Sequence, residues 1–262
     1  MSILVVHLVP EGILFGADRN ITVTRSGGGV ALRGQTQRPK VLRWPNRQVI
    51  VGYVGDAEID GRATDEWLYD FIGRHIDPTE DLATLAAALQ SDLNAALQAG
   101  NLTDICILHL AGFEMDSGEW TPRIWFIRNS TAITPQGAYV QGAAFDASEE
   151  VAQPVYFGGM TGNQIQADLV ARGKQWSPFS FRQGFDLGAF NVLDATLRAA
   201  MRAIVETHPL KKHPFPTDLD EWTKHVRFAV LAYGSYFAAF FAPFEQYVGG
   251  GVDVVSVPWP GP

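Results

Sequence analysis

Ser2 directly follows Met1 at the start of an apolar run, where it could be a reactive residue or simply a common second residue. It opens the stretch SILVVHLVPEGILFGADRN (2–20) and would carry a free α-amine once Met1 is removed. A free α-amine titrates near ~7.7–8.0, so at neutral pH it could take the proton from the Ser2 hydroxyl, directly or through water. Nucleophile and base would then belong to one residue, which is a known way to activate a terminal hydroxyl.

A strand must hold such a residue in place, because chain ends ordinarily fray. Apolar and β-branched runs at 3–9 and 13–23, separated by PEG, predict a hairpin that starts with the chain. Asp18 lies in the second run, within Gly16-Ala17-Asp18-Arg19. The same signals predict a second hairpin of 40–44 and 48–55 across PNR.

After residue 55 the spacing of the hydrophobic residues changes from a strand pattern to a helical one. Trp67, Phe71 and Ile72 have helical spacing within 63–76, and the Ala/Leu-rich segment 81–100 ends at Gly100, a natural helix stop. The later segments predict strands at 104–113, 123–129 and 154–159, helices at 161–172, 186–207 and 218–241, and a last strand in GGVDVVSVPWP (250–260). This order favours two antiparallel sheets whose outer faces are covered by helices.

Composition limits the classes of function. Of the 262 residues, 47% are hydrophobic and 18% charged, which is enough for a sizeable core. The net charge of -8, from 20 Lys+Arg and 28 Asp+Glu, argues against a general nucleic-acid binder. It argues weakly against an anionic membrane surface. We see no secretory signal and no membrane-spanning run, so a cytoplasmic location is expected.

Other candidate sites have simpler explanations. Cys106 lies in the apolar run ICILHL and reads as a core residue, and a single cysteine cannot form an intrachain disulfide. The segment RSGGG (25–29) predicts a turn rather than a phosphate loop. His208 and His213 have no carboxylate or Cys partner at ligand spacing. We therefore expect neither a metal nor another cofactor.

An ordered set of stretches resembles the proteasome-type β-subunits of the N-terminal nucleophile hydrolase superfamily, and the bacterial proteasome-related families more than the eukaryotic subunits. The stretches are EGILFGADRNIT (11–22), PKVLRW (39–44), VIVGYVGDAEIDG (49–61), ILHLAGFEMDSGEWTPRIWFIR (107–128) and YVGGGVDVVSV (247–257). The resemblance implies an α+β fold, a four-layer αββα sandwich of two antiparallel sheets flanked by helices. It also implies one domain over residues 1–262.

The resemblance also implies catalytic roles. Ser2 matches the nucleophile, and Lys40 matches a lysine whose positive charge keeps the α-amine unprotonated, since like charges disfavour each other. Asp18 matches the carboxylate that pairs with this lysine. The backbone N–H of Gly52 matches the donor that stabilises the charge on an attacked carbonyl.

Substrate-binding and supporting positions follow from the same match. Thr22 matches a position whose backbone pairs with an extended peptide, and Ile50 matches a residue that lines an apolar substrate pocket. Glu245 retains the charge of a supporting acidic residue. Gly159 stands where the family has a supporting serine, and Thr161 could replace it.

Each residue also has an ordinary structural explanation. Asp18 at a strand end is often a turn former, and Lys40 could be the charge of an edge strand. Gly52 could mark a bulge or close packing. The separation of Asp18 and Lys40 is longer than is typical of the family, so RNITVTRSGGGVALRGQTQRP (19–39) is expected to be a loop with an insertion.

Three functions remain open at this point. The first is a self-compartmentalising peptidase, a homo-oligomeric ring or spiral that cleaves peptides or unfolded protein, with an ATPase unfoldase as a further partner. The second is a catalytically inactive assembly subunit of the same fold. Two departures from the family favour it: Gly159 in place of the supporting serine, and Val248, which lacks the hydroxyl of the serine that the family has at that position. The third is a small-molecule amidase of the wider superfamily.

Overall fold

The computed structural model describes residues 2–27, 30–133, 139–150, 179–183, 218–240 and 249–260, together with 196, 199, 200, 203 and 216. The expected strand at 154–159 and the expected helices at 161–172 and 186–207 lie outside this set, apart from a few isolated positions. The fold is α+β, and its strands pair antiparallel in separate sheets.

A four-stranded sheet holds the start of the chain. Its order is β12 (Phe179–Gln183), β1 (Leu4–Val9), β2 (Gly12–Asp18) and β13 (Val252–Pro258). The hairpin predicted from the first residues is therefore present, and the strand predicted near the end of the chain pairs with it. The chain's first strand is consequently central in the sheet, with a neighbour on each side.

A five-stranded sheet lies against the first one. Its order is β11 (Tyr139–Glu150), β10 (Glu119–Ile133), β9 (Cys106–Asp116), β6 (Val49–Gly55) and β5 (Val41–Arg43). The sequence predicted β5, β6 and β9, and a shorter β10, but not β11. The β5–β6 hairpin at one edge brings residues near 40 and 55 to the same end of the sheet.

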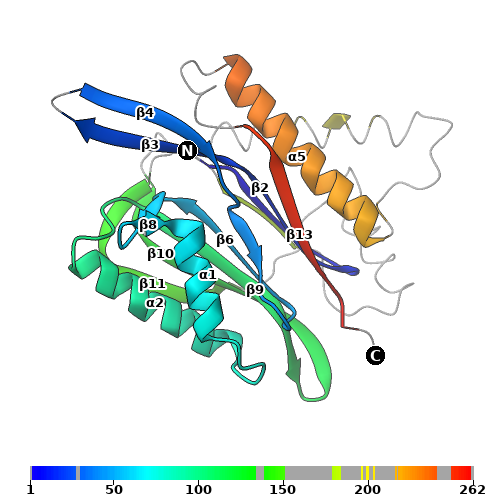
Figure 1. The fold of residues 1–262 in the computed structure, drawn as a ribbon. Coiled ribbons are helices and arrows are strands. Elements are labelled where there is room, and N and C mark those ends of the chain that lie inside the picture. Colours follow the sequence, from blue (N-terminus) through cyan, green and yellow to red (C-terminus); the bar gives the residue numbers. More distant parts are fainter. Residues whose placement is uncertain are drawn as a thin grey trace.

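The segment expected to be a loop between Asp18 and Lys40 forms a separate two-stranded ribbon. Its strands are β3 (Asn20–Gly27) and β4 (Val30–Gln37), which pair antiparallel. Figure 1 shows this ribbon extending past the ends of the two main sheets. A second short ribbon of β7 (Glu58–Ile59) and β8 (Arg62–Ala63) follows β6.

Three described helices cover the outer faces of the sheets. In Figure 1, α1 (Thr64–Arg74) and α2 (Leu82–Gln98) lie on the five-stranded sheet, and α5 (Leu219–Phe240) lies on the four-stranded one. Asp81 caps α2 by accepting a hydrogen bond from the Thr84 N–H at 2.6 Å. Gly100 follows the helix with φ +74°, as its predicted role as a stop requires. None of the described helices has the length and apolar character that crossing a bilayer requires.

Three apolar clusters hold these elements together. One joins α1 and α2 to the five-stranded sheet, one fills the space between the two sheets, and one joins α5 to the four-stranded sheet. The two-sheet α+β architecture expected from the sequence is therefore present. The complete four-layer sandwich stays a prediction, because two of its expected helices lie largely outside the described residues.

Candidate functional site

Asp18 lies at the end of β2, directly opposite the first residues of β1. Because Leu4 pairs with Ala17, Ile3 comes beside Asp18. The Ile3 N–H donates to Asp18 Oδ1 at 2.7 Å. Ser2 is the next residue and is buried, with 8% of its surface exposed. The pairing of β1 with β2 thus places Ser2 beside a buried carboxylate.

Lys40 reaches the same carboxylate from the other sheet. Its Nζ donates to Asp18 Oδ1 at 2.9 Å, and both side chains are only 1% exposed. The backbone of Lys40 is fixed as well, since the Tyr53 N–H donates to the Lys40 carbonyl at 3.0 Å. The predicted pairing of Asp18 with Lys40 is present, and it joins the two sheets at the end where the chain begins.

Two effects act in opposite directions on the protonation of Lys40. Burial lowers its pKa from the ordinary value, and the negative charge of Asp18 opposes that shift. The carboxylate has a further donor, the Gly249 N–H, which lies 3.4 Å from Oδ2. Gly249 was not among the predicted site residues. A buried ammonium held by a carboxylate that accepts other hydrogen bonds as well can act as a fixed positive charge beside Ser2.

Gly52 serves close packing between the sheets. A Cβ atom there would lie 2.9 Å from Phe15 and 3.0 Å from Leu4. The β6–β9 ladder has hydrogen bonds at both ends, from Asp56 N–H to the Ile105 carbonyl at 2.8 Å and from Phe113 N–H to the Gln48 carbonyl at 3.2 Å. Hydrogen-bonded pairs alternate along an antiparallel ladder. Counting every second pair from Gln48 and Phe113 to Asp56 and Ile105 makes Gly52 and His109 a hydrogen-bonded pair. The N–H of Gly52 therefore points toward β9.

Gly55 has the opposite orientation. It differs from Gly52 by an odd number of residues, so its N–H points to the other edge of β6, the edge at which Tyr53 bonds to Lys40. Its φ of +108° requires glycine, because a Cβ would meet the Ile105 carbonyl oxygen at 2.0 Å. We therefore replace Gly52 by Gly55 as the candidate oxyanion donor. The sequence alone could not have identified Gly55, because the edge to which its N–H points depends on the Tyr53–Lys40 hydrogen bond, which only the structure shows.

The first turn of α1 adds residues that sequence reasoning missed. Asp65, which is 3% exposed, accepts a hydrogen bond from Arg38 Nε at 2.6 Å, and Arg38 also pairs with Glu66. Arg38 lies just before Lys40 in the chain. No hydrophobic pattern links it to Asp65, which is why the contact could not be predicted.

Of the remaining predicted residues, the structure describes only Ile50 and Thr22. Ile50 is fully buried in the cluster between the two sheets, so its side chain is core rather than the lining of an accessible pocket. Thr22 lies in β3, where its backbone pairs with that of Gln35. Thr161 and Glu245, like Gly159 and Val248, lie outside the described residues.

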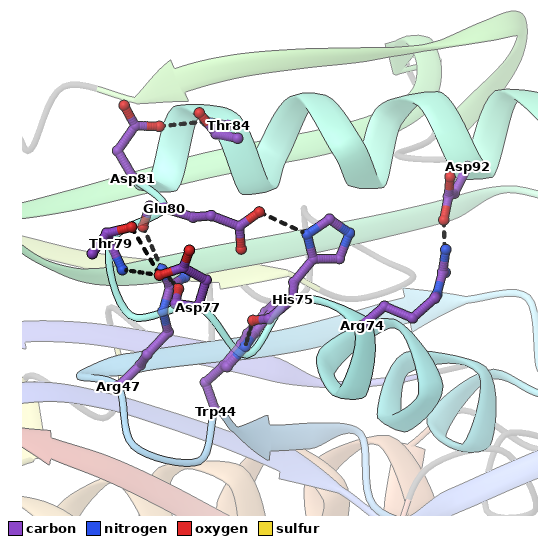
Figure 2. A network of polar contacts seen from close by, with 10 residues as sticks. All are labelled: Trp44, Arg47, Arg74, His75, Asp77, Thr79, Glu80, Asp81, Thr84 and Asp92. Carbon is purple, nitrogen blue, oxygen red and sulfur yellow. Dashed lines mark hydrogen bonds and ion pairs between the residues drawn. The ribbon is translucent and has the colours of Figure 1, made fainter.

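The opposite end of the β5–β6 hairpin carries a different polar network (Figure 2). Arg47 donates through Nη2 to the carbonyls of Asp77 and Glu80, and Trp44 Nε1 donates to the His75 carbonyl at 2.8 Å. These contacts fix the hairpin turn to the loop between α1 and α2. Across the described parts of the chain, no three His, Cys, Asp or Glu side chains are placed to hold a metal ion.

Comparisons with known proteins give little further identification. No family model and no curated protein matches the chain. Among solved structures, the chain is similar to an Anbu (Gly-1) mutant from Hyphomicrobium sp. strain MC1. The two are 13% identical with a TM-score of 0.45, over 98% of this chain and 82% of that one. The residues of this chain alone therefore carry the assignment of the site.

Proposed function

We propose that this protein is an N-terminal nucleophile peptidase. Its catalytic residue is Ser2, which becomes the first residue of the chain after removal of Met1. The observation that carries the proposal is the shared carboxylate of Asp18. It binds the Ile3 N–H at 2.7 Å and Lys40 Nζ at 2.9 Å. One buried group thus fixes the start of the chain relative to a buried cation.

The chemistry follows from these positions. The Ser2 α-amine takes the proton from its own hydroxyl, and the oxygen attacks the peptide carbonyl. The Gly55 N–H donates to the oxygen that becomes negative. The protonated amine then gives its proton to the departing amine of the substrate, which leaves an ester on Ser2 that water hydrolyses. Lys40, held charged by Asp18, favours the neutral state of the α-amine.

An extended peptide is the substrate that best fits this end of the molecule. β3 begins at Asn20, two residues after Asp18, and supplies extended backbone beside the site. A peptide could add to such a strand through main-chain hydrogen bonds. Unfolded protein as the natural substrate, a homo-oligomeric ring or spiral, an ATPase unfoldase and a cytoplasmic location belong to the same proposal.

The test uses intact mass before and after reaction with a β-lactone, whose ring opening adds the whole reagent to a hydroxyl. We expect the mature mass to lack Met1 and to increase by one adduct. Peptide mapping should place this adduct on the N-terminal peptide, which contains Ser2. The Ser2→Ala variant should gain no adduct and lose peptide hydrolysis by at least about 10³-fold, the usual cost of removing a nucleophile. Full hydrolysis by Ser2→Ala would overturn the proposal.

A non-catalytic assembly subunit is the second candidate. The burial of Ser2, only 8% exposed, favours it, because an attacked carbonyl must reach the hydroxyl. This function predicts a mature mass that retains Met1 and no adduct. An amidase would instead label at Ser2 and hydrolyse simple amides faster than peptides.

A further inference from the structure

We infer that the first turn of α1 is a positioning clamp, in which Asp65 holds Arg38 and Thr64 holds Asp56, so that Lys40 and Gly55 keep their relative places. This inference rests on the proposed function and adds positioning residues to it. Neither Asp65 nor Arg38 needs to touch the substrate for the clamp to act.

The clamp contacts both segments that leave the site. On the side of β6, the Thr64 hydroxyl donates to the Asp56 carbonyl at 2.9 Å, and the Thr64 N–H donates to the Ala57 carbonyl at 3.0 Å. Asp56 directly follows Gly55, and Thr64 is fully buried. The end of β6 is therefore fixed to the start of the helix.

On the side of Lys40, the contact runs through a side chain. Arg38 Nε donates to Asp65 Oδ1 at 2.6 Å, while the Arg38 backbone N–H donates to the Arg19 carbonyl at 3.0 Å. Arg19 is the neighbour of Asp18. Arg38 thus links the Asp18 end of β2 to α1, two residues before Lys40.

The electrostatics suit positioning rather than proton transfer. Asp65 lies in the first turn of α1, where the helix dipole favours negative charge. Asp65 and Glu66 raise the pKa of Arg38, so this side chain stays charged at all working pH values. Its planar fork fixes direction in a way that a lysine ammonium does not. Small displacements of catalytic groups can cost on the order of 10²-fold in rate.

The test compares Arg38→Ala and Arg38→Lys with Arg62→Ala. Arg62 is the matched control, since it is an exposed arginine that also pairs with α1, through Asp70 at 2.5 Å. We expect kcat to fall 10- to 100-fold in both Arg38 variants, with KM changed less than threefold. The acid limb of the kcat/KM profile should move to higher pH, because Lys40 no longer holds its charge close to the α-amine.

A second measurement does not depend on activity. The Tyr53 N–H bonds to the Lys40 carbonyl, so its hydrogen exchange reports whether that segment is held. We expect at least tenfold faster exchange in both Arg38 variants and an unchanged rate in Arg62→Ala. Unchanged Tyr53 exchange, or an unmoved acid limb in a variant that hydrolyses peptides through Ser2, overturns the clamp. Full activity of Ser2→Ala overturns the proposed function instead, and the exchange result still decides the clamp.

Discussion

The β5–β6 hairpin carries a buried cation at each end, and the two are held differently. At one end, Lys40 is 1% exposed and faces the Asp18 carboxylate. At the turn, Arg47 is 8% exposed and donates to two backbone carbonyls (Figure 2). Burial lowers the pKa of both side chains.

The difference lies in what each cation can do. An ammonium whose pKa is lowered by burial can exchange its proton or act as a point charge on a neighbouring amine, whereas a guanidinium keeps its charge and its fork geometry. Lys40 is placed beside the first residues of the chain, while Arg47 fixes a loop. A buried cation is therefore not by itself a sign of catalysis, and the groups that it faces distinguish the two roles.

Replacing Lys40 should give the largest effect. Lys40→Met leaves the Asp18 carboxylate buried without its cation, and breaking a buried pair in this way costs about 3–5 kcal/mol of the free energy of unfolding. Peptide hydrolysis should be lost as well. Urea unfolding followed by circular dichroism measures the first effect. A variant as stable as the wild type would show that the pair does not hold the two sheets together.

Replacing Arg47 should cost less and spare activity. Arg47→Met removes charged donors from two carbonyls, and a hydrogen bond to a charged group contributes about 1.5–3 kcal/mol. Unfolding should shift to lower urea while kcat stays within about twofold of the wild-type value, which corresponds to less than about 0.5 kcal/mol. A loss of activity as large as that of Lys40→Met would remove the distinction between the two ends of the hairpin.

Much of the fold could be predicted from the sequence, because hydrophobic period and turn residues act locally. The first hairpin, α1, α2 and the β5–β6 hairpin all carry such signals. β11 was missed because its residues include Asp146, Glu149 and Glu150, which break the apolar alternation of a strand. The return strand β4 was missed because Gly34 and the polar residues after it read as a loop.

Only those residues of the site that lie in recognisable sequence stretches could be predicted. Asp18 and Lys40 were found from the order of matching stretches, although they lie 22 residues apart. The choice between Gly52 and Gly55 depends on the phase of hydrogen bonds in the β6–β9 ladder, which no single stretch reveals. The contact of Arg38 with Asp65 spans 27 residues and arises only from the packing of α1 on the sheet edge.

The smallest predicted effect is a difference in the pH dependence of stability. Burial lowers the pKa of Lys40 in the folded protein below its ordinary value of 10.5. At pH values between the lowered pKa and 10.5, the unfolded chain therefore binds more protons than the folded one. The contribution of Lys40 to the free energy of unfolding therefore rises with pH through that window and is complete above 10.5. Arg47 stays charged in the same range and adds no slope.

Urea unfolding from pH 6 to pH 10 tests this difference. The stability gap between the wild type and Lys40→Met should widen as pH rises, while the gap between the wild type and Arg47→Met should stay constant. Two parallel curves for the wild type and Lys40→Met would mean that Asp18 fully compensates the burial of the ammonium. Lys40 would then keep its charge as firmly as Arg47 does, and only position would separate the two ends of the hairpin.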